Sequence, residues 1–316
     1  MPDNKQRLQY AASPNILKIL AVLVLYNTDI CDCPAIRIFT GSDSFSTRST
    51  FSLLVYDNSA AAQVAGVDER CGYLYVHDPS NGGVAAAYNY ALGLALDEGA
   101  DWILLLDQDT DLPISFLPQL AEAGQTLLNQ ELIAAVVPKI RSRGKLISPT
   151  RPSALRRQKP LDPECSGLVM GPVTAINSGT MVRVSFIELL GGFERVFWLD
   201  FLDHWLFNRI CNAGKCVYVL NAVLDHHLSI ENYTSDVSET RYRNILASET
   251  IFIRTYAGRW DGICYPVVLL ARALKHLIWR KSPRFFVITL KHMALQLLAS
   301  SNRALSRRRW TSAENK

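Results

Sequence analysis

The stretch WILLLDQDTD at residues 102–111 sets three carboxylates behind five apolar residues. A short continuous apolar run that stops at acidic and turn-forming residues is typical of a strand buried on both faces of a parallel sheet. The Ala- and Leu-rich stretch 84–98 is helical, and strand-like runs stand at 19–26 (ILAVLVLY), 51–56 (FSLLVY) and 73–76 (YLYV). Strands that alternate with a helix predict an α/β protein with a mostly parallel sheet, whose ligands bind at the carboxyl ends of the strands.

Polar and glycine-rich clusters follow the predicted strands, so we expect them to meet at one edge of the sheet. Asn81-Gly82-Gly83 permits a close backbone approach to a ligand and presents a helix N-terminus to anions, although a glycine turn capped by asparagine fits equally well. Asp57 fits either an Asx turn or a carboxylate that hydrogen-bonds a nucleotide base. The clusters are Tyr26-Asn27-Thr28-Asp29, Asp57-Asn58-Ser59, Asn81-Gly82-Gly83 and Asp107-Gln108-Asp109-Thr110-Asp111.

Asp107 and Asp109 stand where a buried strand ends, and like charges in such a place repel unless a cation compensates them. Carboxylate oxygens are preferred ligands of hard divalent cations, and Mg²⁺ is usually held by one or two carboxylates plus substrate phosphates. The pair therefore predicts a site for Mg²⁺ or Mn²⁺. The alternative is a solvated turn in which Thr110 and Asp111 begin the next helix before Pro113.

Two further groups of titratable residues lie in the second half of the chain. Asp200 and Asp203 are three residues apart, so they share a helical face or its entry loop. Asp203 stands among aromatic residues that would raise its pKa, which makes it the candidate general base; the alternative is a helix cap or an electrostatic neighbour of Arg209. After a predicted strand, His226 or His227 is a candidate third metal ligand, with a structural histidine as the alternative.

The composition of the 316 residues, 49% hydrophobic and 20% charged, fits a folded core and excludes a disordered chain. Seven cysteines show no zinc-binding spacing, so we expect reduced thiols. The apolar stretches 16–26 and 263–279 contain charges and are shorter than the ~20 residues of a membrane helix. Residues 1–10 lack the pattern of a secretory signal, and 141–165, rich in proline and basic residues, is typical of a mobile loop. We therefore expect a cytoplasmic protein.

The net charge of +4 divides unevenly, because residues 272–316 carry eleven Lys and Arg against one acid and the rest of the chain has an excess of acid. A cationic helix face of this kind suits an anionic membrane surface, and packing on the rest of the protein or a dimer interface is the alternative. Nucleic-acid binding is disfavoured because no aromatic–basic motif accompanies the charge. The cationic face is predicted over 267–281, with Arg272, Lys275, His276 and Arg280 opposite Leu270, Leu274, Leu277 and Ile278.

The segments LVLYN, VYDNS, NGGVAAAYN, LLLDQDTD, NSGT, GGF, FLDHWLFNR and DHH follow one another in this order between residues 16 and 256. The ordered set resembles family 2 glycosyltransferases of the GT-A fold, and most of all bacterial rhamnosyltransferases. Its specific parts are the Asp-x-Asp element of Asp107 and Asp109, and Asp203 in a Leu-Asp-x-x-Leu-x-x-Arg frame. The family's Glu-Asp pair is here Leu202-Asp203, so any role of the first acid is expected to pass to Asp200.

The resemblance implies an enzyme: an inverting, metal-dependent glycosyltransferase with a GT-A, Rossmann-like, mostly parallel sheet flanked by helices. The implied reaction moves L-rhamnose from dTDP-L-rhamnose to a glycan or lipid-linked acceptor, in cell-surface polysaccharide synthesis at the inner face of the cytoplasmic membrane. We expect an N-terminal tail (1–15), a catalytic domain (16–256) with a nucleotide-binding half (16–111) and an acceptor half (112–256), and a C-terminal basic helical extension (257–316).

By the same resemblance, Asp203 deprotonates the acceptor hydroxyl, and a Mg²⁺ or Mn²⁺ ion held by Asp109, with Asp107 near the ribose or the ion, neutralises the departing diphosphate. Two other functions stay open: a phosphatase of the haloacid dehalogenase type with Asp107 as nucleophile and Asp109 as acid/base, and a non-catalytic membrane-associated scaffold of the GT-A fold. The residues expected to bind the nucleotide sugar are Tyr26, Asn27, Asp57, Asn81, Gly82, Gly83 and Asp107, with Asp200, Trp205 and Arg209 as acceptor or supporting residues.

Overall fold

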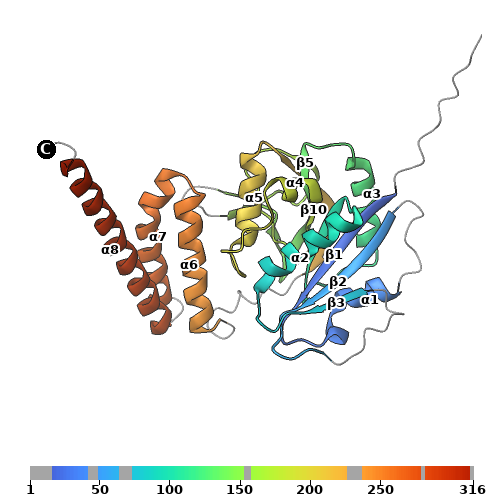
Figure 1. Ribbon diagram of the computed structural model, residues 1–316, viewed down its shortest axis with the longest axis horizontal. Helices are drawn as coiled ribbons and strands as arrows, with labels where there is room; N and C mark the ends of the chain where they lie inside the picture. The colour runs from blue at the N-terminus through green and yellow to red at the C-terminus, as the bar shows by residue number, and fades with distance from the viewer. Residues whose placement is uncertain are drawn as a thin grey trace, which may run out of the picture.

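A nine-stranded sheet forms the centre of the protein (Figure 1). The computed structural model describes residues 16–41, 49–63, 73–152, 158–225, 237–278 and 282–313. The strand order is β3-β2-β1-β4-β10-β5-β11-β9, and β6 pairs with β5. The strands that run parallel are β1 (Leu17–Leu25), β2 (Ser49–Asp57), β3 (Tyr73–His77), β4 (Trp102–Asp107), β5 (Ile133–Ser142) and β11 (Cys216–Asp225), and the short antiparallel ones are β6 (Lys145–Ser148), β9 (Gly167–Val169) and β10 (Met181–Arg183).

The predicted α/β class with a mostly parallel sheet is confirmed. The four predicted strands are β1 to β4, and the predicted helix is α2 (Gly83–Glu98). The prediction of a loop over 141–165 was wrong in part, because β6 and the small sheet of β7 (Thr150–Pro152) and β8 (Gln158–Pro160) lie there. Pro152 and Pro160 are tolerated there because each is the last residue of a three-residue strand in a two-stranded sheet.

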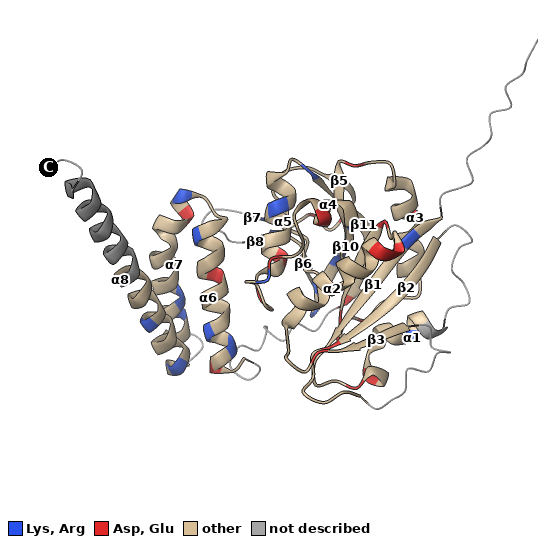
Figure 2. Cartoon of the chain, viewed as in Figure 1, with Lys and Arg blue, Asp and Glu red and all other residues tan. Residues whose placement is uncertain are grey.

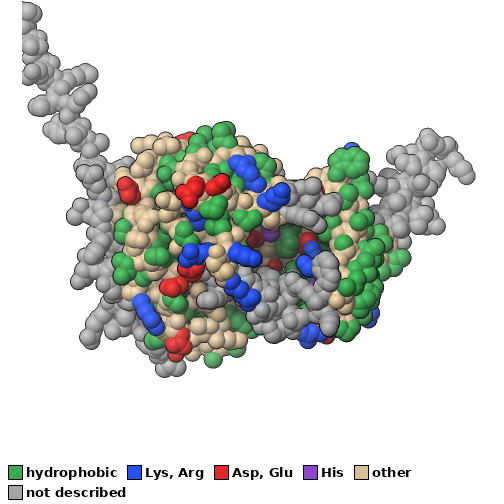
Figure 3. All heavy atoms as spheres, turned by 180° about the vertical axis from the view of Figure 1, so that it is seen from behind, with side chains coloured by type: hydrophobic (Ala, Val, Ile, Leu, Met, Phe, Trp, Pro, Cys, Tyr) green, Lys and Arg blue, Asp and Glu red, His purple; other side chains and the backbone are tan. Residues whose placement is uncertain are grey.

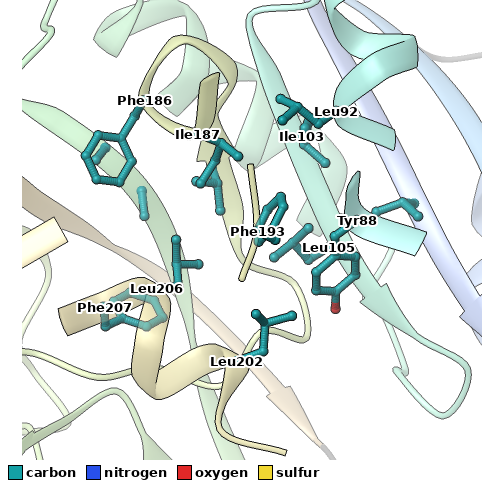
Figure 4. Close-up of a cluster of buried hydrophobic side chains, with 14 of the residues drawn as sticks. Tyr88, Leu92, Ile103, Leu105, Phe186, Ile187, Phe193, Leu202, Leu206 and Phe207 are labelled. Carbon is teal, nitrogen blue, oxygen red and sulfur yellow. The ribbon is translucent and has the colours of Figure 1, made fainter. Parts of the chain in front are cut away.

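Helices cover both faces of the sheet, which explains the continuous apolar runs of its strands. Alternate residues of β1 enter opposite cores: Val22 packs with α2, α4 (Val184–Leu189) and α5 (Leu202–Asn212), and Leu23 packs with α1 (Pro34–Gly41) and α3 (Phe116–Leu127). Figure 4 shows part of the first core, where Tyr88 and Leu92 of α2 face Phe193 and the β4 residue Leu105. This packing fixes the strand ends and the start of α5 relative to each other.

Three helices, α6 (Glu239–Thr255), α7 (Arg259–Ile278) and α8 (Pro283–Ala313), pack beside the α/β part as a helical unit with its own core (Figure 1). Tyr242 and Phe285 lie in that core, and Phe252 of α6 packs in the α/β core instead. Helix α6 therefore joins the two parts, although the sequence groups it with the catalytic domain. Within the described ranges, no helix offers an apolar stretch of bilayer-spanning length.

Candidate active site

A cleft of about 770 Å³ lies between the carboxyl ends of β1 and β4, the segment before α5, and the N-terminal end of α6. Figure 3 shows a hollow between the α/β part and the helical unit, with acidic and histidine side chains at its floor. Four carboxylates line the cleft, those of Asp107, Asp109, Asp200 and Asp203. Of the other residues predicted from sequence, Tyr26, Asn81 and Gly83 line it, whereas Asn27, Asp57, Gly82, Trp205 and Arg209 are not among its lining residues.

The loop after β1 is held by side chains that follow β2 and β4. The Tyr26 N–H donates to Gln108 Oε1 at 2.8 Å, and the Asn27 N–H donates to Ser59 Oγ at 2.8 Å. Asn27 takes a left-handed conformation (φ 51°), which asparagine tolerates better than most residues. Gln108, the middle residue of the Asp-x-Asp element, also lines the cleft. Its side chain thus ties the loop after β1 to the strand end that bears the carboxylates.

Asp57 is fully buried at the end of β2 and is the centre of a hydrogen-bond network. Its carboxylate accepts from the Ser59 N–H at 2.9 Å, the Tyr75 hydroxyl at 2.7 Å and Gln63 Nε2 at 3.3 Å. Burial by itself would raise the pKa of Asp57, but these hydrogen bonds outweigh it and lower the pKa. All these partners belong to this chain, and Asn58 lines the cleft beside it. Recognition of a nucleotide base by Asp57 stays a prediction.

The turn before α2 is packed against the segment before α5. Gly83 has a φ of 75°, and a methyl group there would lie 2.3 Å from the carbonyl oxygen of Trp198. Two hydrogen bonds join the segments: Val84 N–H to the Trp198 carbonyl at 3.0 Å, and Trp198 Nε1 to the Asn81 carbonyl at 2.8 Å. Glycine is therefore required at 83 for a backbone contact within this chain, which positions the segment that leads through Asp200 into α5 and Asp203.

Asp107 and Asp109 present hard oxygen donors at the end of β4. Asp107 Oδ2 accepts a hydrogen bond from the buried Ser178 hydroxyl, which holds the carboxylate in place. The donor set fits Mg²⁺ or Mn²⁺, which favour carboxylates completed by phosphate oxygens and water. Within the described part of the chain, no three or more of His, Cys, Asp and Glu gather as a metal-binding group. The predicted third ligand, His226, and its neighbour His227 lie outside the described residues.

Asp200 and Asp203 flank the start of α5. Phe201 precedes the helix in a left-handed conformation (φ 73°), and Asp203 sits in the first turn, where its Oδ1 accepts from the His204 N–H at 2.7 Å. Burial raises the pKa of Asp200, and the negative charge of Asp203 raises it further, while Arg241 opposes both. Trp205, on the same helix, is buried in the α/β core, so its contribution is to packing.

The N-terminal end of α6 supplies a wall of the cleft that the sequence analysis missed. Ser238 caps the helix, its hydroxyl accepting from the Arg241 N–H at 3.1 Å. Thr240, Arg241 and Asn244 line the cleft, and Arg241 Nη2 lies 3.7 Å from Asp200 Oδ1. Arg241 is the one Lys or Arg among the described lining residues. The available signal was Ser238 directly before the acidic Glu239, a pair typical of a helix N-cap and first turn.

The comparisons with known proteins identify the fold. No family model and no curated protein sequence matches the chain. The architecture of this chain matches that of solved structures with the GT-A fold. S. aureus TarS matches at 14% identity and a TM-score of 0.50, over 81% of this chain and 48% of TarS, so the chain spans about half the length of TarS. TarS 1–349 matches at 13% identity and a TM-score of 0.50, over 89% of this chain and 83% of that one.

Proposed function

We propose that this protein is an inverting glycosyltransferase that moves a sugar from a nucleoside diphosphate sugar to an acceptor hydroxyl. The observation that carries the proposal is the convergence of Asp107, Asp109 and Asp203 on one cleft at the carboxyl ends of a parallel sheet. Two carboxylates suited to a divalent cation and one suited to proton transfer are the groups that this reaction needs. TarS 1–349, similar in fold, has also been solved in complex with UDP-GlcNAc, which favours a nucleotide sugar as the ligand class.

In the proposed reaction, a carboxylate oxygen of Asp203 accepts the proton of the acceptor hydroxyl as its oxygen attacks the anomeric carbon. The bond to the diphosphate breaks on the opposite face, through an oxocarbenium-like transition state, and the configuration inverts. Asp107 and Asp109 would hold the divalent cation, which would supply charge neutralisation for the departing diphosphate. Asp200 lines the same cleft and pairs with Arg241, which lowers the pKa of Asp200 while burial and the charge of Asp203 raise it.

The finer assignments follow from the sequence resemblance. We propose L-rhamnose from dTDP-L-rhamnose as the transferred sugar, with a glycan or lipid-linked acceptor of a cell-surface polysaccharide. The excess of Lys and Arg in residues 272–316 supports a protein held at an anionic membrane surface, as a lipid-linked acceptor requires. A peripheral position on the cytoplasmic membrane follows from that acceptor.

The test is the variant Asp203→Asn, assayed as release of dTDP or UDP from dTDP-L-rhamnose or UDP-GlcNAc with a bacterial lipid extract as acceptor source. We expect a loss of about 100-fold or more in transfer, with nucleotide affinity unchanged, because general-base catalysis contributes about 10²–10⁴. Asp111→Asn is the matched control, since that exposed carboxylate is not among the lining residues. Full activity of Asp203→Asn would remove the base assignment, and phosphate release from a phosphomonoester would favour the phosphatase.

A further inference from the structure

The solvent-facing side of α7 carries a continuous apolar ridge. Its six residues are spaced alternately by three and four positions, so they fall on one face of the helix. All are exposed, with exposed fractions between 44% and 78%, and Figure 3 shows hydrophobic side chains gathered on the outer side of the helical unit. An exposed apolar patch of this extent marks a contact with another surface. The ridge consists of Trp260, Ile263, Val267, Leu270, Leu274 and Leu277.

The ridge reverses the orientation that the sequence favoured for this helix. The predicted cationic face is partly internal: Arg272 makes a two-pronged ion pair with Glu249 of α6, at 2.5 and 2.7 Å, and His276 is buried against Tyr242. The inward face also buries Tyr265, Leu269 and Ala273, and the six apolar residues of the ridge point outward. The surface of α7 that is available to meet lipid is therefore the apolar ridge and not the predicted cationic face.

The positive charge around the ridge favours an anionic membrane over a second copy of the chain as its partner. From residue 259 to residue 313 the sequence has eleven Lys and Arg and a single acid, Asp261. Arg259, Lys275, Arg284 and Lys291 are exposed, and Figure 2 shows Lys and Arg along α6, α7 and α8. Two copies packed ridge to ridge would bring these like charges together, which disfavours self-association. An anionic lipid surface instead attracts the cations while its acyl region takes up the apolar side chains.

We propose that the ridge on α7 inserts into the headgroup–acyl boundary of an anionic membrane, with the flanking Lys and Arg on the phosphates. This deepens the proposed function, since it names the face that meets the membrane. The same helical unit contributes Thr240 and Arg241 of α6 to the cleft. Insertion of the ridge thus orients the cleft with respect to the lipid surface, where a lipid-linked acceptor hydroxyl would be presented.

The experiment is flotation of the full chain with vesicles of phosphatidylcholine alone and with vesicles that also contain phosphatidylglycerol. The ridge variant Ile263→Gln/Val267→Gln/Leu274→Gln keeps the net charge and removes three exposed apolar side chains. We expect about tenfold or more weaker binding to the anionic vesicles, because burial of aliphatic side chains is lost. The matched control Ile114→Gln/Met170→Gln/Leu189→Gln removes three apolar residues of the α/β part that are on average more exposed, and it should bind like wild type.

The thermal midpoint of the ridge variant should equal that of wild type, because exposed positions contribute little to stability. Wild-type binding by the ridge variant, or no binding of wild type to the anionic vesicles, overturns the proposal. So does a wild-type dimer in sedimentation equilibrium that the ridge variant abolishes, since the ridge would then serve a second copy. Vesicle binding is independent of turnover, so its failure leaves the Asp203 test of the glycosyltransferase unaffected.

Discussion

Replacing Gly83 by alanine tests whether the junction between α2 and the segment before α5 holds the cleft together. The methyl group would meet the Trp198 carbonyl oxygen at 2.3 Å and the indole ring at 2.6 Å, and the backbone has a φ of 75°. Since backbone atoms cannot give way as a flexible side chain does, the Trp198 segment must move. Its displacement breaks the hydrogen bonds from Val84 N–H and from Trp198 Nε1.

The expected loss follows from these contributions. A left-handed conformation costs a residue with a Cβ about 1–2 kcal/mol, and two hydrogen bonds contribute about 1 kcal/mol each. Gly83→Ala should therefore lower the free energy of unfolding by about 3–4 kcal/mol. Gly93→Ala is the matched control in the same helix, because a Cβ there meets nothing within 4 Å. It should stabilise the protein by about 0.5–1 kcal/mol, the cost of glycine inside a helix.

The assay is urea denaturation followed by circular dichroism, with nucleotide affinity measured on the folded variants. Gly83→Ala should also weaken nucleotide binding, because the Trp198 segment carries lining residues of the cleft. A Gly83→Ala protein as stable as wild type would refute the reasoning. So would equal effects of the two substitutions, since only one of the glycines is in contact with Trp198.

Three further perturbations have defined outcomes. Asp57→Asn should lower the free energy of unfolding by about 3 kcal/mol at neutral pH, since hydrogen bonds to a buried carboxylate are lost. Because the pKa of Asp57 is lowered in the folded protein, this stabilisation is present above pH ~4 and is lost as the pH falls through the folded pKa. Urea melts of wild type and Asp57→Asn should therefore converge in acid. Glu249→Gln should lower the free energy of unfolding, measured in urea, by about 3 kcal/mol, because Arg272 is left without its ion-pair partner. The double variant Glu249→Leu/Arg272→Met should recover most of that stability. Arg241→Gln should raise the pKa of Asp200, because Arg241 lowers it; an unchanged titration of the Asp200 carboxyl, followed by NMR, excludes that coupling.

The sequence predicts the elements with a strong local signal and the residues directly attached to them. Strand β4 and its carboxylates are an example, because a continuous apolar run ending in acids has one common structural solution. The glycine pair at 82–83 predicts a close backbone approach, but the residue that approaches Gly83, Trp198, lies more than a hundred residues away in the sequence. Such a contact depends on tertiary packing that no local pattern encodes.

Other features were hidden for the same reason. Asp57 has the chemistry of a ligand-binding carboxylate, and its burial depends on Tyr75, brought beside it by the pairing of β2 with β3. The inward position of Arg272 on α7 is compensated by Glu249 of α6, a pairing between two helices that is not visible in the sequence. Arg241 belongs to a helix whose first turn reaches the cleft through the packing of the helical unit. In each case the sequence shows the residue type, but the partner that determines its position comes from a distant part of the chain.

The most direct measurement is a calorimetric titration of dTDP and UDP into wild type and Asp109→Ala, with Mn²⁺ and with a chelator. The account predicts nucleotide binding by wild type that Mn²⁺ strengthens, and the loss of that Mn²⁺ effect in Asp109→Ala, because Asp109 would help to hold the ion that neutralises the diphosphate charge. Equal affinities in all four combinations would contradict the claim that these carboxylates hold a nucleoside diphosphate through a cation.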